Sequence, residues 1–143
     1  MTIARLIAGR SGEVWSIHAQ DTVADAIEML SSHKIGALPV HDGENAVAGI
    51  FSERDVIRAL TAHGEDALRL PVSAVMTAPV VTVSPDTSVM EALALMTRRR
   101  FRHLPVLDDG RMVGFISIGD LVKYRLDRIE AEADAMRVYI QSV

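Results

Sequence analysis

Residues 49–56 read GIFSERDV, and residues 114–121 repeat the same pattern as GFISIGDL. In each stretch a glycine is followed by a serine and then an aspartate, at equal spacing. Ser-x-x-Asp is a common start of a helix, because the hydroxyl and the carboxylate satisfy free backbone N–H groups of the first turn. A helix start with these groups can also bind a ligand, since its N–H donors suit phosphate and its carboxylate suits a sugar diol. Glycine at a strand end often marks a close approach of a ligand or another backbone, so both interpretations stay open.

The two stretches belong to a longer internal repeat. Residues 21–60 and 86–126 align with small gaps and share Asp-Thr, Leu-Pro-Val, a glycine-containing turn and Gly-x-x-Ser-x-x-Asp. A repeat of this length is too long for a solenoid unit and suits two copies of a small subdomain. The predicted organisation is a first domain at 3–66, a connector at 67–73, a second domain at 74–127 and a C-terminal helix extension at 128–143.

Each copy contains the pattern β-α-β-β-α. The β-rich runs EVWSI (13–17) and PVVTV (79–83) predict a first strand in each copy. Apolar residues at helical spacing then follow a capping pair, Thr22 with Asp25 in one copy and Ser88 with Glu91 in the other. Apolar runs around DGENA and DDGR predict a hairpin, and the last helix begins at Ser-x-x-Asp. The expected fold class is α/β (α+β), with two pseudo-symmetric units.

The last helix of the second copy continues well beyond its counterpart in the first. Its apolar residues advance in alternating steps of four and three, as in a heptad seam: Val122, Leu126, Ile129, Ala133, Met136, Ile140 and Val143. The seam packs either on its own module or on a second subunit. In both cases it predicts an interaction surface and not a catalytic one.

Composition limits the classes of function. The chain has 143 residues, of which 49% are hydrophobic and 24% charged, as expected for one globular protein with a core. The N-terminus lacks the apolar centre of a signal peptide and no long apolar run is present, so a soluble cytoplasmic protein is the expectation. The absence of Cys excludes disulfides and thiolate sites. A net charge of -4 predicts no binding to nucleic acid or membrane.

No catalytic constellation is recognisable. The five histidines show no metal-ligand spacing, and the chain has no P-loop, G-x-G-x-x-G or G-x-S-x-G motif. Ser52 and Ser117 lie near aspartates, but no histidine recurs beside both as a base. The sequence therefore predicts a protein that is not an enzyme and requires no cofactor or metal.

The run RRRFRH at 98–103 is the sharpest charge feature. Arginines at the end of a helix are favoured by its dipole, and a solvated face is an equally ordinary interpretation. A nucleic-acid patch is a weaker alternative, because only Phe101 is aromatic and no wider basic surface accompanies it. Arg102 and His103 directly precede the interior strand LPV, where an arginine needs an anionic partner. A phosphate site is therefore the preferred functional interpretation.

The motifs GALPV, GIFSERD, VMTAPVVTVSPDTSV, RHLPV and GFISIGD recur in order over about residues 3–127. In this the chain resembles the cystathionine beta-synthase (CBS) domain, in the tandem arrangement called a Bateman module, and in particular its small stand-alone bacterial type. The resemblance implies two units around a pseudo-twofold axis, two clefts between them and a homodimer. It also implies that a cleft can hold an adenosine-containing ligand: AMP, ADP, ATP, NAD or S-adenosylmethionine.

The resemblance also implies the residues of each cleft. The ribose carboxylates are Asp55 and Asp120, and their hydroxyl neighbours are Ser52 and Ser117. The cleft of Asp55 is expected to have Ile50, Val80 and Val81 as walls and Arg102 and His103 at the phosphate. The cleft of Asp120 is expected to use Phe115, Val14, Trp15, Gly36 and Ala37, with Arg54 at the phosphate.

The two copies depart from each other at one informative place. IGALPV in the first copy matches FRHLPV in the second, so Gly36 and Ala37 stand where Arg102 and His103 would be. The clefts should therefore differ, and the cleft of Asp55 is the better candidate for a charged nucleotide. The N-terminal lead is also longer than its counterpart, which loosens the assignment of Val14 and Trp15.

Two functions of different classes follow. The first is a non-catalytic, homodimeric regulatory sensor of adenine nucleotides that acts on an unidentified regulated protein. The alternative is a ligand-independent dimerisation or protein-interaction module that acts through the C-terminal heptad helix, with the Ser-x-x-Asp pairs as helix caps only.

Overall fold

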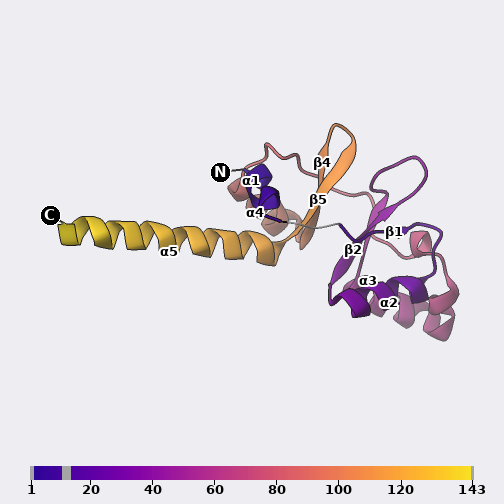
Figure 1. Cartoon of the computed structure of the whole chain (residues 1–143). Coiled ribbons are helices and arrows are strands. Elements are labelled where there is room, and N and C mark those ends of the chain that lie inside the picture. Colours follow the sequence, from indigo (N-terminus) through magenta and orange to yellow (C-terminus); the bar gives the residue numbers. More distant parts are fainter. Residues whose placement is uncertain (1, 11–13, 143) are drawn as a thin grey trace.

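The computed structural model of the chain describes residues 2–10 and 14–142. Two small units lie side by side, and the last helix projects away from both of them (Figure 1). The helices are α1 (Ile3–Ala8), α2 (Val23–His33), α3 (Glu53–His63), α4 (Val89–Arg99) and α5 (Ile118–Ser142). The strands are β1 (Ile17–His18), β2 (Ala37–His41), β3 (Gly49–Ser52), β4 (His103–Asp108) and β5 (Arg111–Ser117). Short 3-10 helices occupy Gly64–Arg69 and Val72–Ala74.

Helices α2 and α4 begin at the capping residues that the sequence indicates. In α2, Oγ1 of Thr22 accepts a hydrogen bond from N of Asp25, and the Asp25 carboxylate accepts one from N of Thr22. In α4, Ser88 accepts from N of Glu91 at 3.0 Å. These contacts satisfy backbone N–H groups that a helix start leaves free. The predicted helices are confirmed.

Both predicted hairpins are present. Strand β2 pairs antiparallel with β3, and β4 pairs antiparallel with β5. The loop between β4 and β5 is formed by Asp109 and Gly110, which both have positive φ, as a tight two-residue turn requires. The hairpins bring the end of the second strand, where α3 or α5 begins, close to the start of the first strand: Ser52 is opposite Ala37, and Ser117 is opposite His103.

The predicted first strands at 13–17 and 79–83 are largely wrong. Strand β1 has only two residues, Ile17 and His18, and pairs parallel with β2, while Glu13 lies outside the described residues. In the second unit Val83 alone forms a parallel bridge with Val106. Val80 and Val81 instead line a cavity, so their β-branched side chains form part of the cavity wall and not of a β-sheet.

Each unit is completed by a segment that precedes the other repeat. Ile3 and Leu6 of α1 are buried in the core of the second unit, with Leu104 and Ile116. Val72 is buried in the core of the first unit, and Met76 packs against it. The apolar lead of each copy thus covers the hairpin of the opposite copy, while the domain bounds 3–66 and 74–127 stay a prediction.

The repeated glycines mark the positions where these leads touch the hairpins. A Cβ atom on Gly49 would lie 2.5 Å from Sδ of Met76, and one on Gly114 would lie 2.9 Å from Cγ2 of Ile7. Both distances are shorter than real Cβ contacts. Gly49 and Gly114 therefore allow the close approach of another segment of the chain, which is one of the two roles considered from the sequence.

Helix α5 is a single helix of 25 residues, and Leu121 is its only buried residue. The described seam residues are exposed: Val122 at 44%, Met136 at 58% and Ile140 at 65%. Figure 1 shows the helix extending away from the two units. The alternative in which the seam packs on its own module is therefore wrong for the described residues, whereas Val143 lies outside them.

Candidate functional site

Asp55 occupies the first turn of α3 and is buried, with 3% exposure. Its Oδ2 accepts hydrogen bonds from N of Ser52 at 2.9 Å and from Oγ of Ser52 at 3.1 Å. The Ser-x-x-Asp of the first copy is thus a capping box, as the sequence indicates. A buried charge requires donors, and the helix start supplies two of them.

The third donor comes from the lead of the second repeat. Oγ1 of Thr77 donates to Oδ1 of Asp55 at 2.8 Å. Thr77 is held there because its backbone N–H and C=O both pair with Ile50, at 2.8 and 2.9 Å. Thr77 was not among the predicted site residues, and its only signal in the sequence is a hydroxyl residue within the motif VMTAPVV. The segment with Met76 and Thr77, which packs against Gly49, therefore also places the Thr77 hydroxyl against the Asp55 carboxylate.

A cavity of about 660 Å³ opens beside Asp55, between the start of α3 and two segments of the second unit. Apolar and cationic side chains share its wall, which contains Gly36, Ile50, Ser52, Glu53, Arg54, Asp55, Ile57, Arg58, Thr77, Pro79, Val80, Val81, Arg99, Arg100, Phe101, Arg102 and His103. Its volume falls in the range typical of small-molecule sites.

The cavity gathers all seven residues expected around Asp55, which are Ile50, Ser52, Asp55, Val80, Val81, Arg102 and His103. It also contains Gly36 and Arg54, which the resemblance assigned to the cleft of Asp120. Ala37 is buried at 3% exposure and pairs with Ser52 in the sheet, so it lies behind the wall. Arg58, Arg99 and Arg100 were not among the expected site residues, although the last two belong to the basic run.

Asp120 has the same helix-start contacts but a different third partner. N of Ser117 donates to its Oδ2 at 2.8 Å, and N of Asp120 donates to Oγ of Ser117 at 3.1 Å. Nη2 of Arg10 lies 2.7 Å from Oδ1 of Asp120, and Nη1 of Arg10 donates to O of Phe115 at 3.4 Å. Burial raises the pKa of Asp120, but the hydrogen bonds from Arg10 and Ser117 outweigh it and hold the pKa below its ordinary value. An internal cation thus stands where Thr77 stands in the first copy.

The other residues expected around Asp120 are dispersed. Trp15 stacks on His33 with ring centroids 3.7 Å apart, and Phe115 stacks on His103 at 5.4 Å. Val14 is half-buried. Neither Asp120 nor the rings of Trp15 and Phe115 belong to the wall of the cavity at Asp55. The two copies therefore differ more than the exchange of Gly36 and Ala37 for Arg102 and His103 predicts.

His103 lies at the junction of the two carboxylate sites. Burial lowers the pKa of its imidazole, and the positive charge of Arg102 lowers it further. The carboxylates of Asp120 and Glu53 act in the opposite direction but are the weaker influence. The neutral ring offers a donor and an acceptor to the cavity, and an anion bound beside it would favour its protonation.

The described residues offer neither a metal site nor a membrane span. Within residues 2–10 and 14–142, no group of three or more His, Asp or Glu side chains is arranged to hold a metal ion. In the same ranges, no helix combines the length and the apolar character needed to cross a membrane.

Comparison with known proteins gives consistent matches. The model of the CBS domain matches residues 10–62 and 72–127. The mitochondrial CBS domain-containing protein CBSX3 of Arabidopsis thaliana is 40% identical over 125 residues, which cover 85% of this chain and 61% of that protein. The chain thus spans less than two thirds of this relative's length.

Two solved structures share the fold of the whole pair. A CBS-domain-containing protein of Agrobacterium tumefaciens is 37% identical, with a TM-score of 0.81 over 87% of this chain and 92% of that one. The structure of CBSX2 in complex with AMP is 26% identical, with a TM-score of 0.75 over 88% of this chain and 96% of that one. With two copies matched in order and both hairpins in place, the chain belongs to the CBS-domain family and folds as a tandem pair.

Proposed function

We propose that this protein is a non-catalytic regulatory module that binds an adenosine-containing nucleotide, such as AMP, ADP, ATP or NAD, in the cavity at Asp55. The observation that carries the proposal is the buried carboxylate of Asp55, which lies in the wall of a cavity that is also lined by arginine side chains. A carboxylate has about four acceptor positions. Three are used by Ser52 and Thr77, which leaves capacity for a ribose hydroxyl.

The rest of the wall suits the other parts of such a ligand. Ile50, Val80 and Val81 offer apolar surface for a base. Arg102 and His103 offer donors for a phosphate. The AMP complex of CBSX2, a relative with the same fold, supports the choice of an adenosine-containing ligand. Both units contribute to the cavity wall, so binding would alter the orientation of one unit relative to the other. An unidentified partner protein would respond to that change.

Calorimetric titration with AMP, ADP, ATP and NAD tests the proposal. Replacing Asp55 by Ala removes a charge-assisted hydrogen bond of about 1.5–3 kcal/mol, so affinity should fall roughly 10- to 150-fold. Asp25→Ala is the matched control, because Asp25 has the same capping role in α2 and lies outside the cavity wall. The site assignment fails if Asp55→Ala titrates like the unmodified protein.

We also propose a homodimer formed through the exposed seam of α5. A helix of this length with an apolar stripe is rarely left in water, and a second copy supplies a matching stripe. This is also the surface of the alternative function, in which the protein acts as an interaction module without a ligand. Light scattering on Ile129→Asp should give a monomer, while Ala131→Asp, on the outer face of the same helix, should leave the dimer intact. A monomeric unmodified protein would overturn the proposal.

A further inference from the structure

Five arginines from both units line the cavity at Asp55. Arg54 and Arg58 lie on α3 of the first unit, and Arg99, Arg100 and Arg102 lie at or after the end of α4 in the second. The cavity lies where these two segments meet. A ligand with one phosphate can engage only some of these side chains.

No carboxylate among the described residues neutralises the five guanidinium groups. Among the described residues none of them forms an ion pair with a carboxylate, whereas Arg10, Arg69, Arg128 and Arg137 each do. The wall contains two acidic residues, Glu53 and Asp55, and Asp55 already accepts hydrogen bonds from Ser52 and Thr77. These five arginines form a positive rim of the cavity. The net charge of the whole chain is -4, so the positive charge of the rim is a local feature.

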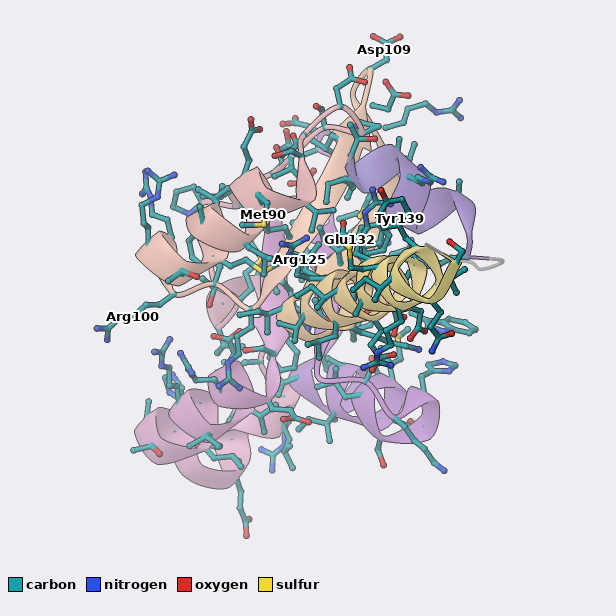
Figure 2. All side chains as sticks on the ribbon, turned by 90° about the vertical axis from the view of Figure 1, so that its left-hand side faces the viewer. Met90, Arg100, Asp109, Arg125, Glu132 and Tyr139 are labelled. Carbon is teal, nitrogen blue, oxygen red and sulfur yellow. The ribbon has the colours of Figure 1, made fainter. Side chains whose placement is uncertain are left out.

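Arg100 occupies a backbone position that suits another residue. It follows α4 in the left-handed conformation, with φ of 57°, where glycine is the most common residue. Lys34 has the same conformation after α2, with φ of 54°, but lies outside the cavity wall. Figure 2 shows the Arg100 side chain extending outward from the end of its helix. Strained backbone positions cluster at functional sites, so a charged side chain held at such a position beside a cavity indicates a functional role.

We propose that the ligand at Asp55 is a nucleoside polyphosphate, with its phosphate chain held between the arginines of α3 and those that follow α4. This inference rests on the proposed function and narrows it. Arginine binds phosphate oxygens through two parallel N–H donors, so each further phosphate adds partners for side chains that form no ion pair with a described carboxylate. A nucleoside without phosphate leaves the rim unused, and an adenosine carrying a sulfonium is repelled by it.

The first experiment compares adenosine, AMP, ADP and ATP by calorimetry in one buffer of fixed ionic strength. Affinity should rise at least tenfold from AMP to ATP, which corresponds to about 1.4 kcal/mol. Raising the salt concentration should weaken ATP binding more than adenosine binding, because the rim is exposed. Inorganic triphosphate should bind far more weakly than ATP, since it lacks the ribose contact of Asp55.

The second experiment uses the strained position. Arg100→Gly relieves the backbone conformation, so the melting temperature should rise by roughly 2–4 °C. The same variant should lose at least tenfold in ATP affinity while adenosine affinity stays unchanged. Lys34→Gly is the matched control, because it should raise the melting temperature in the same way and leave ATP affinity unaltered. A gain in stability combined with a loss of ATP binding separates a ligand contact from a folding defect.

The outcomes distinguish this inference from the function on which it rests. If no adenosine compound binds, both are overturned. If AMP binds as tightly as ATP, or if Arg100→Gly and Lys34→Gly bind ATP equally well, the polyphosphate inference is wrong and the nucleotide site remains. If inorganic triphosphate matches ATP, the nucleoside part of the inference is wrong.

Discussion

The guanidinium of Arg10 lies 2.7 Å from the carboxylate of Asp120, at the position where a hydroxyl of Thr77 meets the repeat counterpart Asp55. The two copies of Gly-x-x-Ser-x-x-Asp thus hold their carboxylates in different ways. One is satisfied by neutral donors and faces a cavity, and the other is already paired with a cation of the same chain. The two copies share the hairpin and the helix start at Ser-x-x-Asp, and they differ in the charge of the group that meets the carboxylate.

Arg10→Gln should show how strongly that pair contributes. The ion pair is partly exposed, so the loss of stability near neutral pH should be about 0.2–1 kcal/mol. Arg10 helps to lower the pKa of Asp120, so the contribution is present above the ordinary value of 3.8 and is lost as pH falls through the lowered pKa. Urea denaturation at neutral and acidic pH measures the difference between the variant and the unmodified protein.

The control for this prediction is Arg69→Gln, which removes the far more exposed pair with Asp66. It should change stability less than Arg10→Gln. A difference for Arg10→Gln that is the same at both pH values would contradict the assigned role of Asp120.

Gly49→Ala should destabilise the first unit. The added Cβ would lie 2.5 Å from Sδ of Met76 and 3.0 Å from O of Thr77, and overpacking of this kind costs about 1–3 kcal/mol. Gly43→Ala is the control, because nothing lies within 4 Å of a Cβ at that position. Equal denaturation midpoints for the two variants would show that the lead from the second repeat does not press on the hairpin.

His103 should make stability depend on pH. Burial, with Arg102, lowers the pKa of the imidazole in the folded protein, although Asp120 and Glu53 oppose the change. The unfolded chain therefore binds more protons than the folded one as pH falls below the ordinary value of 6.5, and stability should decrease there. Denaturation curves across this range should show a smaller decrease for His103→Gln. A larger decrease in the variant would reverse the sign and refute the prediction.

The proposed dimer should be a parallel coiled coil. Figure 2, which shows α5 extending toward the viewer, labels Arg125, Glu132 and Tyr139, which are spaced by one heptad beside the seam. In a parallel pair Arg125 faces Glu130 of the second copy and Glu132 faces Arg137. An antiparallel pair centred on residue 131 brings Glu130 against Glu130, and a shifted antiparallel register keeps only the contact of Glu130 with Arg137.

A single introduced cysteine tests the orientation, because the chain has none of its own. Leu126→Cys should form a disulfide-linked dimer under mild oxidation, since a parallel pair in register places the two copies of this seam residue opposite each other. In the antiparallel register centred on residue 131, the same residue faces Met136 of the second copy. Ala131→Cys, on the outer face, is the control and should not crosslink. Absence of the Leu126→Cys dimer, in a protein that is dimeric by light scattering, rules out the parallel arrangement.

Much of the fold could be predicted because its signals are local. Capping residues, apolar spacing and turn residues lie within a few positions of each other, so α2, α4 and both hairpins follow from the sequence. Local signals could not decide whether 13–17 and 79–83 form strands, because a run of β-branched residues can line a cavity as well as form a strand. Val80 and Val81 lie in such a wall.

The site was predictable only where a repeated motif indicated it. Ser52 and Asp55 follow from Gly-x-x-Ser-x-x-Asp, and Arg102 and His103 follow from a basic pair entering an interior strand. Thr77 and Arg10 could not be predicted, because each reaches its carboxylate from the lead of the other repeat. Their contacts depend on how the two units fit together, which no local pattern records.

Each unit is covered by the segment that precedes the other repeat, so neither repeat should fold alone if the chain is cut between them. A fragment ending at residue 66 would retain α1 but lack Val72 and Met76, which cover its own hairpin. The complementary fragment would have those residues but lack Ile3 and Leu6. Each half carries the missing part of the other, so the two pieces should regain structure only when mixed, as a split protein that reassembles by mutual complementation.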